Sequence, residues 1–125
     1  MNENELSNII IGAALTVHRD LGPGLLESVY EECFDFELNE RDIKFERQKY
    51  IPVVYKNIKL EGAFRADFII ENKIIVELKA VESIANTHKS QLLTYLKLTD
   101  LKLGLLINFN NSLLKDGIHR VVNKL

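Results

Sequence analysis

The spacing of apolar residues changes along the chain, from helical in the first third to strand-like in the middle. Helical spacing over residues 4–20 predicts an amphipathic helix, whose apolar positions are Leu6, Ile9, Ile10, Ala13 and Val17. The sequence LGPG at 21–24 ends that helix, because glycine and proline interrupt helical backbone. A second helix is predicted over residues 25–41. Its expected apolar stripe consists of Leu26, Val29, Cys33, Phe34 and Phe36.

The rest of the chain reads as strands around one further helix. Strands are predicted at residues 44–55, 63–70 and 73–80, with turns at Lys56-Asn57 and at 71–73. A third helix is expected over 85–98, with Leu92, Leu93 and Leu96 facing inward. A buried strand at 102–109 follows, and residues 116–125 are expected to add a short edge strand. This order predicts one α/β domain over residues 1–125, in which helices flank a mixed sheet.

Charged residues interrupt two of these apolar strands, in the stretch RADFIIENKIIVELKA at residues 65–80. A strand buried on both faces should be almost purely apolar, so Asp67, Glu77 and Lys79 need a reason. A three-residue turn would pair Ile70 with Ile74 and would place Asp67 directly opposite Glu77. A two-residue turn would put the two carboxylates on opposite faces, unless a bulge restored the register.

Two adjacent carboxylates repel each other unless a cation lies between them or one of them stays protonated. Carboxylate oxygens suit Mg²⁺, which proteins often hold with one or two carboxylates plus water and phosphate. Lys79 would then lie beside the ion, where it could orient water or stabilise charge on a phosphate. The alternative is a surface ion pair, in which Lys79 balances Glu77 on a solvated face of the sheet.

The helices add further candidates for a site. Glu27 and Tyr30 are neighbours on the second helix, and His88, Gln91 and Tyr95 form a polar stripe on the third. Each also has an ordinary explanation. Tyr95 could be a half-buried core residue, and Gln91 could be solvated. His18 could be a histidine on a helix surface.

Composition narrows the class of protein. The chain has 125 residues, a formal net charge of −2 and one cysteine, Cys33, which is expected to be a small core residue. The acidic start MNENEL differs from a signal peptide, and the longest apolar stretch is too short to span a bilayer. We therefore expect a cytoplasmic protein without membrane contact.

Three motifs, taken together, resemble a known family. Asp67 followed by Glu77-Leu78-Lys79 resembles the D…(D/E)xK signature of PD-(D/E)XK nucleases, although Ala66 stands where that signature often has proline. Gln91 and Tyr95 resemble the QxxxY motif of the RecB-like branch. GLLESVY at 24–30 matches the motif that names the GxxExxY family, which is placed in this superfamily. The resemblance covers essentially the whole chain and implies a restriction-endonuclease-like αβββαβ core.

The resemblance also implies an activity and a set of roles. It implies a nuclease that hydrolyses phosphodiester bonds with Mg²⁺ or Mn²⁺, in which Asp67, Glu77 and Glu27 bind the metal and Lys79 serves catalysis. Gln91, Tyr95, His18 and Tyr30 would contact the substrate or order the site. Nucleic acid is the expected partner, with DNA favoured over RNA. A homodimer is also expected, since so small a chain has little surface to hold a duplex. The alternative is an inactive nuclease-like module that binds nucleic acid or a protein.

Overall fold

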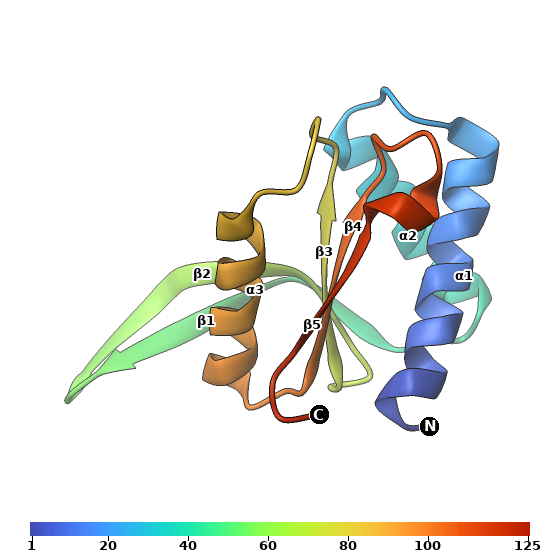
Figure 1. The fold of residues 1–125 in the computed structure, drawn as a ribbon. Coiled ribbons are helices and arrows are strands. Elements are labelled where there is room, and N and C mark those ends of the chain that lie inside the picture. The colour runs from blue at the N-terminus through green and yellow to red at the C-terminus, as the bar shows by residue number, and fades with distance from the viewer.

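A five-stranded mixed sheet lies between helices on its two faces in the computed structural model, which describes residues 1–125 (Figure 1). The helices are α1 (Glu3–Leu21), α2 (Glu27–Glu40) and α3 (Asn86–Thr99). The strands are β1 (Phe45–Tyr55), β2 (Ile58–Ile70), β3 (Ile74–Lys79), β4 (Leu103–Asn108) and β5 (Ile118–Val122), with a short 3₁₀ turn at Leu114–Gly117. The predicted α/β class and the element order are confirmed.

The strands lie in the order β1-β2-β3-β4-β5. Neighbours pair antiparallel except β3 and β4, which are parallel and are joined by α3 as a crossover. The edge strand predicted at the end of the chain is confirmed as β5. None of the helices is both long and apolar enough to cross a membrane.

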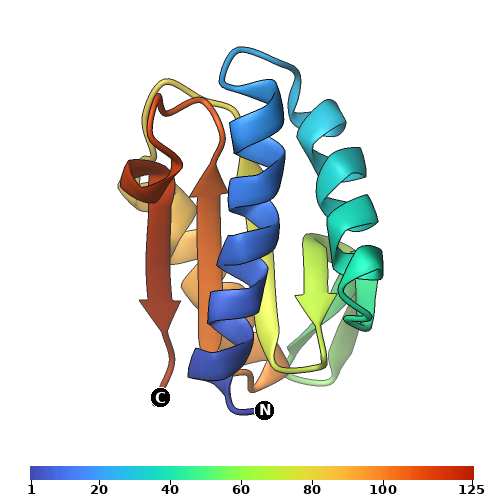
Figure 2. The ribbon, with the colours of Figure 1, turned by 90° about the vertical axis from the view of Figure 1, so that its right-hand side faces the viewer.

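The two faces of the sheet carry separate apolar cores. Helices α1 and α2 pack side by side on one face, and α3 covers the other (Figure 2). On the α1–α2 side, Phe34 lies edge-on to Phe68 at a centroid distance of 5.0 Å. On the α3 side, Leu92 and Leu96 pack with Ile75 and Leu106. A functional site therefore has to lie at an end of this three-layered arrangement, where no helix covers the sheet.

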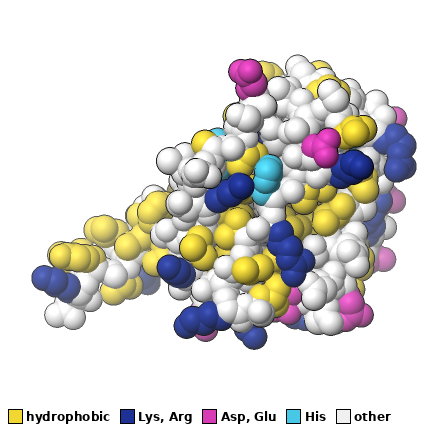
Figure 3. Space-filling model, in the orientation of Figure 1, with side chains coloured by type: hydrophobic (Ala, Val, Ile, Leu, Met, Phe, Trp, Pro, Cys, Tyr) yellow, Lys and Arg dark blue, Asp and Glu magenta, His cyan; other side chains and the backbone are white.

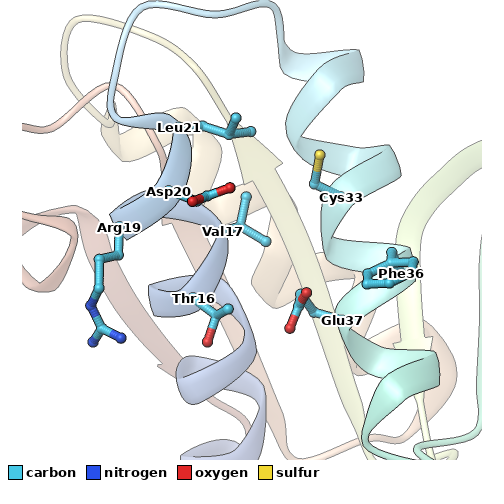
Figure 4. A pocket seen from close by; sticks show the side chains of 8 residues that line it. All are labelled: Thr16, Val17, Arg19, Asp20, Leu21, Cys33, Phe36 and Glu37. Atoms are coloured by element: carbon cyan, nitrogen blue, oxygen red, sulfur yellow. The ribbon is translucent and has the colours of Figure 1, made fainter.

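Helix α2 faces the core with a different stripe from the predicted one. The buried residues are Tyr30, Phe34 and Leu38, whereas Leu26 and Phe36 are 74% and 59% exposed. Residues four apart support either of two overlapping stripes, and the ring stacking of Tyr30 on Phe109 selects the observed one. Two of the five residues of the predicted stripe instead line a hollow between α1 and α2. Cys33 and Phe36 face Val17 and Leu21 there (Figure 4).

The two faces of the β1–β2 ladder exchange sides at Gln48 and Asp67, so the hairpin turns over there. Phe68 belongs to the core under α1 and α2, but Ala66, which should share its face, belongs to the core under α3. The ladder pairs Arg47 with Phe68 and Lys49 with Ala66 but omits the pair between them, and Gln48 has a φ of 55°. This local reversal directs the far end of the hairpin away from the body (Figure 1). Because β2 begins at Ile58, the hairpin is also longer than the sequence suggested.

Close packing between α3 and β4 yields the first prediction. A Cβ added at Gly104 would lie 2.7 Å from Leu92 Cγ, so alanine there must push α3 outward. We expect Gly104→Ala to lower the free energy of unfolding by about 1–3 kcal/mol, measured by urea denaturation. Combining it with Leu92→Ala should cost less than the sum of the two single changes, because the smaller side chain frees the space. Additive losses would contradict this contact.

Candidate active site

Asp67 and Glu77 meet where the β2–β3 ladder ends. The backbone pairs run from Ile70↔Ile74 to Phe68↔Val76, and the intervening turn holds three residues, as predicted. One step further, side chains replace the backbone ladder. The Asp67 N–H donates to Glu77 Oε2 at 2.6 Å, and the Leu78 N–H donates to Asp67 Oδ2 at 2.9 Å. Each carboxylate is therefore held by the backbone of the opposite strand.

No positive charge pairs with these two carboxyls, and the pKa of each is raised. Glu77 is only 5% exposed, and neither carboxylate forms an ion pair. Burial raises the pKa of Glu77 to about 8, and the Asp67 charge adds to the effect. Burial also raises the pKa of Asp67 to about 6, with contributions from the charges of Glu31 and Glu27. Backbone N–H donors oppose both shifts without cancelling them. Without a cation, the pair therefore retains a proton near neutral pH.

Lys79 ends β3 beside the pair but does not neutralise it. Its side chain is half-buried and has no carboxylate oxygen within 4.0 Å, although its charge lowers the pKa of both Asp67 and Glu77. The interpretation of Lys79 as the partner of a surface Glu77 is wrong, because Glu77 is buried and unpaired. Lys79 is thus an ammonium close to two acids with its hydrogen-bond donors still available.

Glu27 lies nearby but does not complete a ligand cluster. It is the exposed first residue of α2, and its charge raises the pKa of both Asp67 and Glu77. No three His, Cys, Asp or Glu side chains in residues 1–125 lie close enough together to hold a metal ion. The predicted convergence of Glu27 with the other two carboxylates is therefore absent from this arrangement of side chains.

Helix α3 contributes one buried and one exposed polar side chain. Tyr95 is 4% exposed and lies edge-on to Phe64 at 5.3 Å. Burial, followed by the charges of Glu77 and Asp67, raises the pKa of the Tyr95 phenol. Tyr95 is thus a core residue whose hydroxyl lies within electrostatic reach of the acids. Gln91, one turn earlier, is exposed.

Two of the residues expected to contact the substrate or order the site, Tyr30 and His18, bond to backbone groups. Tyr30 is completely buried; its hydroxyl donates to the Gly22 carbonyl at 2.6 Å and accepts from the Leu25 N–H at 3.1 Å. It holds the LGPG loop in place and has no surface for a substrate. His18 is 9% exposed, and its Nε2 lies 2.8 Å from the carbonyl oxygen of Asn111. These contacts fix two loops: the one that leads to Glu27 and the one that follows β4.

A polar network on β1 and α2 escaped the sequence reasoning. Arg47 bonds Glu31 at 3.0 Å, Glu32 at 2.6 Å and Asp35 at 3.2 Å. These acids raise the pKa of Arg47 well above its ordinary value, with Glu32 the largest cause. Gln48 donates to Glu31, and its Oε1 atom is buried without a hydrogen-bond partner. Only the helical spacing of Glu31 and Asp35 could have indicated this network, since its β1 partners are distant in sequence.

Asn108 fixes the chain just after Lys79. It is fully buried at the end of β4 and pairs with Lys79 in the parallel ladder. Its side-chain amide donates to the Val81 carbonyl at 2.8 Å, and its Oδ1 accepts from the Val81 N–H at 3.0 Å. The side chain thereby continues the ladder where the backbone strand stops, which limits the movement of the segment that carries Lys79.

The donor chemistry of the pair fits a hard divalent cation. Two carboxylates anchored by backbone N–H groups, with no cation to balance them, match the one or two protein carboxylates that commonly bind Mg²⁺ or Mn²⁺. Glu27 is the nearby acid available as a further ligand. Water and substrate oxygens would supply the remaining ligands.

Comparisons with known proteins point to one family. A profile of the family described as the PD-(D/E)XK nuclease superfamily matches residues 4–121. A solved structure titled "Crystal structure of SSO0001" is similar in fold, with a TM-score of 0.59 and 19% sequence identity. The similarity covers 98% of this chain but 60% of that one. A search of the curated proteins found no match.

The raised pKa of Glu77 predicts a pH-dependent stability in metal-free buffer. A carboxyl whose folded pKa exceeds its unfolded value destabilises the protein once pH rises above the unfolded pKa. The free energy of unfolding of the wild type, measured with urea, should therefore fall relative to Glu77→Gln between about pH 4.5 and about pH 8. The difference should reach roughly 1–4 kcal/mol.

The matched control is Glu40→Gln, which removes an exposed carboxylate at the other end of α2. Its stability curve should run parallel to that of the wild type. If the stability curve of Glu77→Gln also ran parallel to that of the wild type, burial would not raise the pKa of Glu77 in the folded protein.

Proposed function

The chain belongs to the PD-(D/E)XK nuclease superfamily, and from this membership we propose that it is a divalent-metal-dependent nuclease. The observation that carries the proposal is the Asp67–Glu77 pair, two acids held by opposite strands without a cation. A fold without catalytic work gains nothing from such a pair, because burial of uncompensated acids is destabilising. Superfamily membership gives the fold, and the site gives the reason to expect chemistry.

Asp67 and Glu77 would hold the metal ion, and Glu27 would serve as a third ligand after a change of rotamer at the start of α2. When bound, the ion supplies Lewis-acid polarisation of a phosphate oxygen and makes its coordinated water more acidic. Mg²⁺ is the proposed ion and Mn²⁺ the substitute. The rigid anchoring of both carboxylates by backbone N–H groups would keep them in position when the proton leaves the pair.

The remaining roles follow from position and exposure. Lys79 would donate to the attacking water or to a phosphate oxygen, because its ammonium lies beside the acids without an ion-pair partner. Gln91, exposed in the middle of α3, would contact the substrate backbone. Tyr95 would support the floor of the site through its buried ring and its hydroxyl.

We also propose the finer assignments suggested by sequence. GLLESVY and the Gln91–Tyr95 pair support the GxxExxY family and a RecB-like relationship. DNA is the proposed substrate, the cytoplasm the proposed location and a homodimer the proposed assembly. The chain spans only 60% of the similar solved protein.

The proposal predicts cleavage of labelled oligonucleotides in the presence of Mg²⁺ or Mn²⁺ and none in EDTA. Lys79→Met should keep the fold, since Lys79 is outside the Val76 and Leu78 core, and should lower the cleavage rate about 10²–10⁴-fold. Glu77→Gln should also abolish cleavage. Single-stranded and duplex DNA and RNA would be tested side by side by gel electrophoresis.

The matched control is Lys97→Met, which changes an exposed lysine on α3 and should cleave at the wild-type rate. A folded Lys79→Met protein as fast as wild type would end the catalytic assignment. Absence of metal-dependent cleavage on every substrate would favour the inactive binding module.

A further inference from the structure

The β1–β2 hairpin extends beyond the three-layered body as an arm, here residues 49–65 (Figure 1). At about 3.3 Å per residue, the seven residues from Lys49 to Tyr55 project roughly 20 Å. No helix covers the outer half of the arm, and a two-stranded hairpin alone is marginally stable in water. A partner that binds the arm would therefore order it.

The arm exposes apolar and aromatic side chains. Tyr50, Val54, Tyr55 and Ile58 are 58%, 63%, 60% and 57% exposed. Figure 3 shows hydrophobic side chains along the projecting arm, with basic side chains among them. Tyr50 lies opposite Arg65, and Val54 lies opposite Lys59, so apolar and basic side chains are neighbours across the arm.

The charge of the arm differs from that of the rest of the chain. The arm has four basic residues, Lys49, Lys56, Lys59 and Arg65, and one acidic residue, Glu61. The remainder has twelve basic and seventeen acidic residues. Lys56 lies over the Tyr55 ring at 5.4 Å, and neither Lys56 nor Arg65 has a carboxylate oxygen within 4.0 Å. A polyanion would therefore be attracted mainly to the arm.

We propose that the arm binds single-stranded nucleic acid and leads it to the carboxylate pair. Positive charge for the backbone combined with exposed aromatic rings for unpaired bases is the chemistry of single-strand binding surfaces. A second copy of the chain would cover the apolar side chains but would bring the like charges of two arms together. The Lys59–Glu61 pair is exposed on both sides and gives way readily to phosphate.

The arm also has a physical connection to the site. Arg65 precedes Asp67 by two residues on the same strand, and Gln48, where the hairpin turns over, lies across from Asp67. A strand held along the arm would therefore arrive beside the acids. This inference rests on the proposed nuclease function, so its test needs a readout other than cleavage.

The test measures the binding of a fluorescein-labelled oligodeoxythymidine by anisotropy in EDTA, where no cleavage is expected. Changing Lys56→Ser together with Lys59→Ser should weaken binding at least tenfold. It should also reduce the slope of log K against log salt concentration by about 1.4, the value for two lost phosphate contacts. Tyr50→Ser with Tyr55→Ser should weaken it at least fivefold. The matched control, Lys115→Ser with Lys124→Ser, removes two exposed lysines outside the arm and should stay within twofold.

A second assay separates failure of the arm from failure of the active site. Hydrolysis of bis(p-nitrophenyl) phosphate with Mn²⁺ needs no arm and should be unchanged in both arm variants. If that ester and all oligonucleotides resist hydrolysis, the nuclease function fails while the binding result still decides the role of the arm. Arm variants that bind like the control would overturn the proposal. The proposal would also be overturned if sedimentation showed a dimer that the double variant Tyr55→Ser, Ile58→Ser dissociates without a change in oligonucleotide affinity.

Discussion

The crosswise attachment of two acids to two strands is the constraint on which the site depends. Asp67 takes the N–H of Leu78, and Glu77 takes the N–H of Asp67, at the point where β2 and β3 stop pairing through their backbones. Side chains therefore satisfy backbone donors that would otherwise be orphaned in a buried place. The same exchange fixes the two carboxylates next to each other, at the cost of like-charge repulsion in a buried site.

The surrounding structure supports that arrangement from both faces of the sheet. Helix α3 packs against Gly104 closely enough to exclude a Cβ there, and it brings Tyr95 within electrostatic reach of the acids. On the other face, Tyr30 ties down the loop that leads to Glu27. Asn108 continues the ladder beyond Lys79. Supports on both faces of the sheet thus hold the charged groups where β2 and β3 stop pairing.

Sequence predicted the features that depend on local spacing. Strand alternation and a three-residue turn were enough to bring Asp67 opposite Glu77, because register in a short hairpin follows from the turn. The stripe predicted for α2 was wrong except for Phe34, because two overlapping helical stripes were available. The choice was made by Phe109, which is far away in sequence and stacks on Tyr30. The reversal at Gln48 was invisible, since a glutamine with positive φ is imposed by its surroundings. The Arg47 cluster depends equally on distant partners.

The most direct test of the central claim is a calorimetric titration of the wild type with Mn²⁺, repeated in two buffers of different ionisation enthalpy near pH 7. The pair retains a proton when no metal is present, so binding should be accompanied by proton release, seen as a difference in heat between the buffers. Glu77→Gln should show neither the binding nor the release. No detectable binding to the wild type, or equal binding to Glu77→Gln, would contradict the assignment of Asp67 and Glu77 as a metal site.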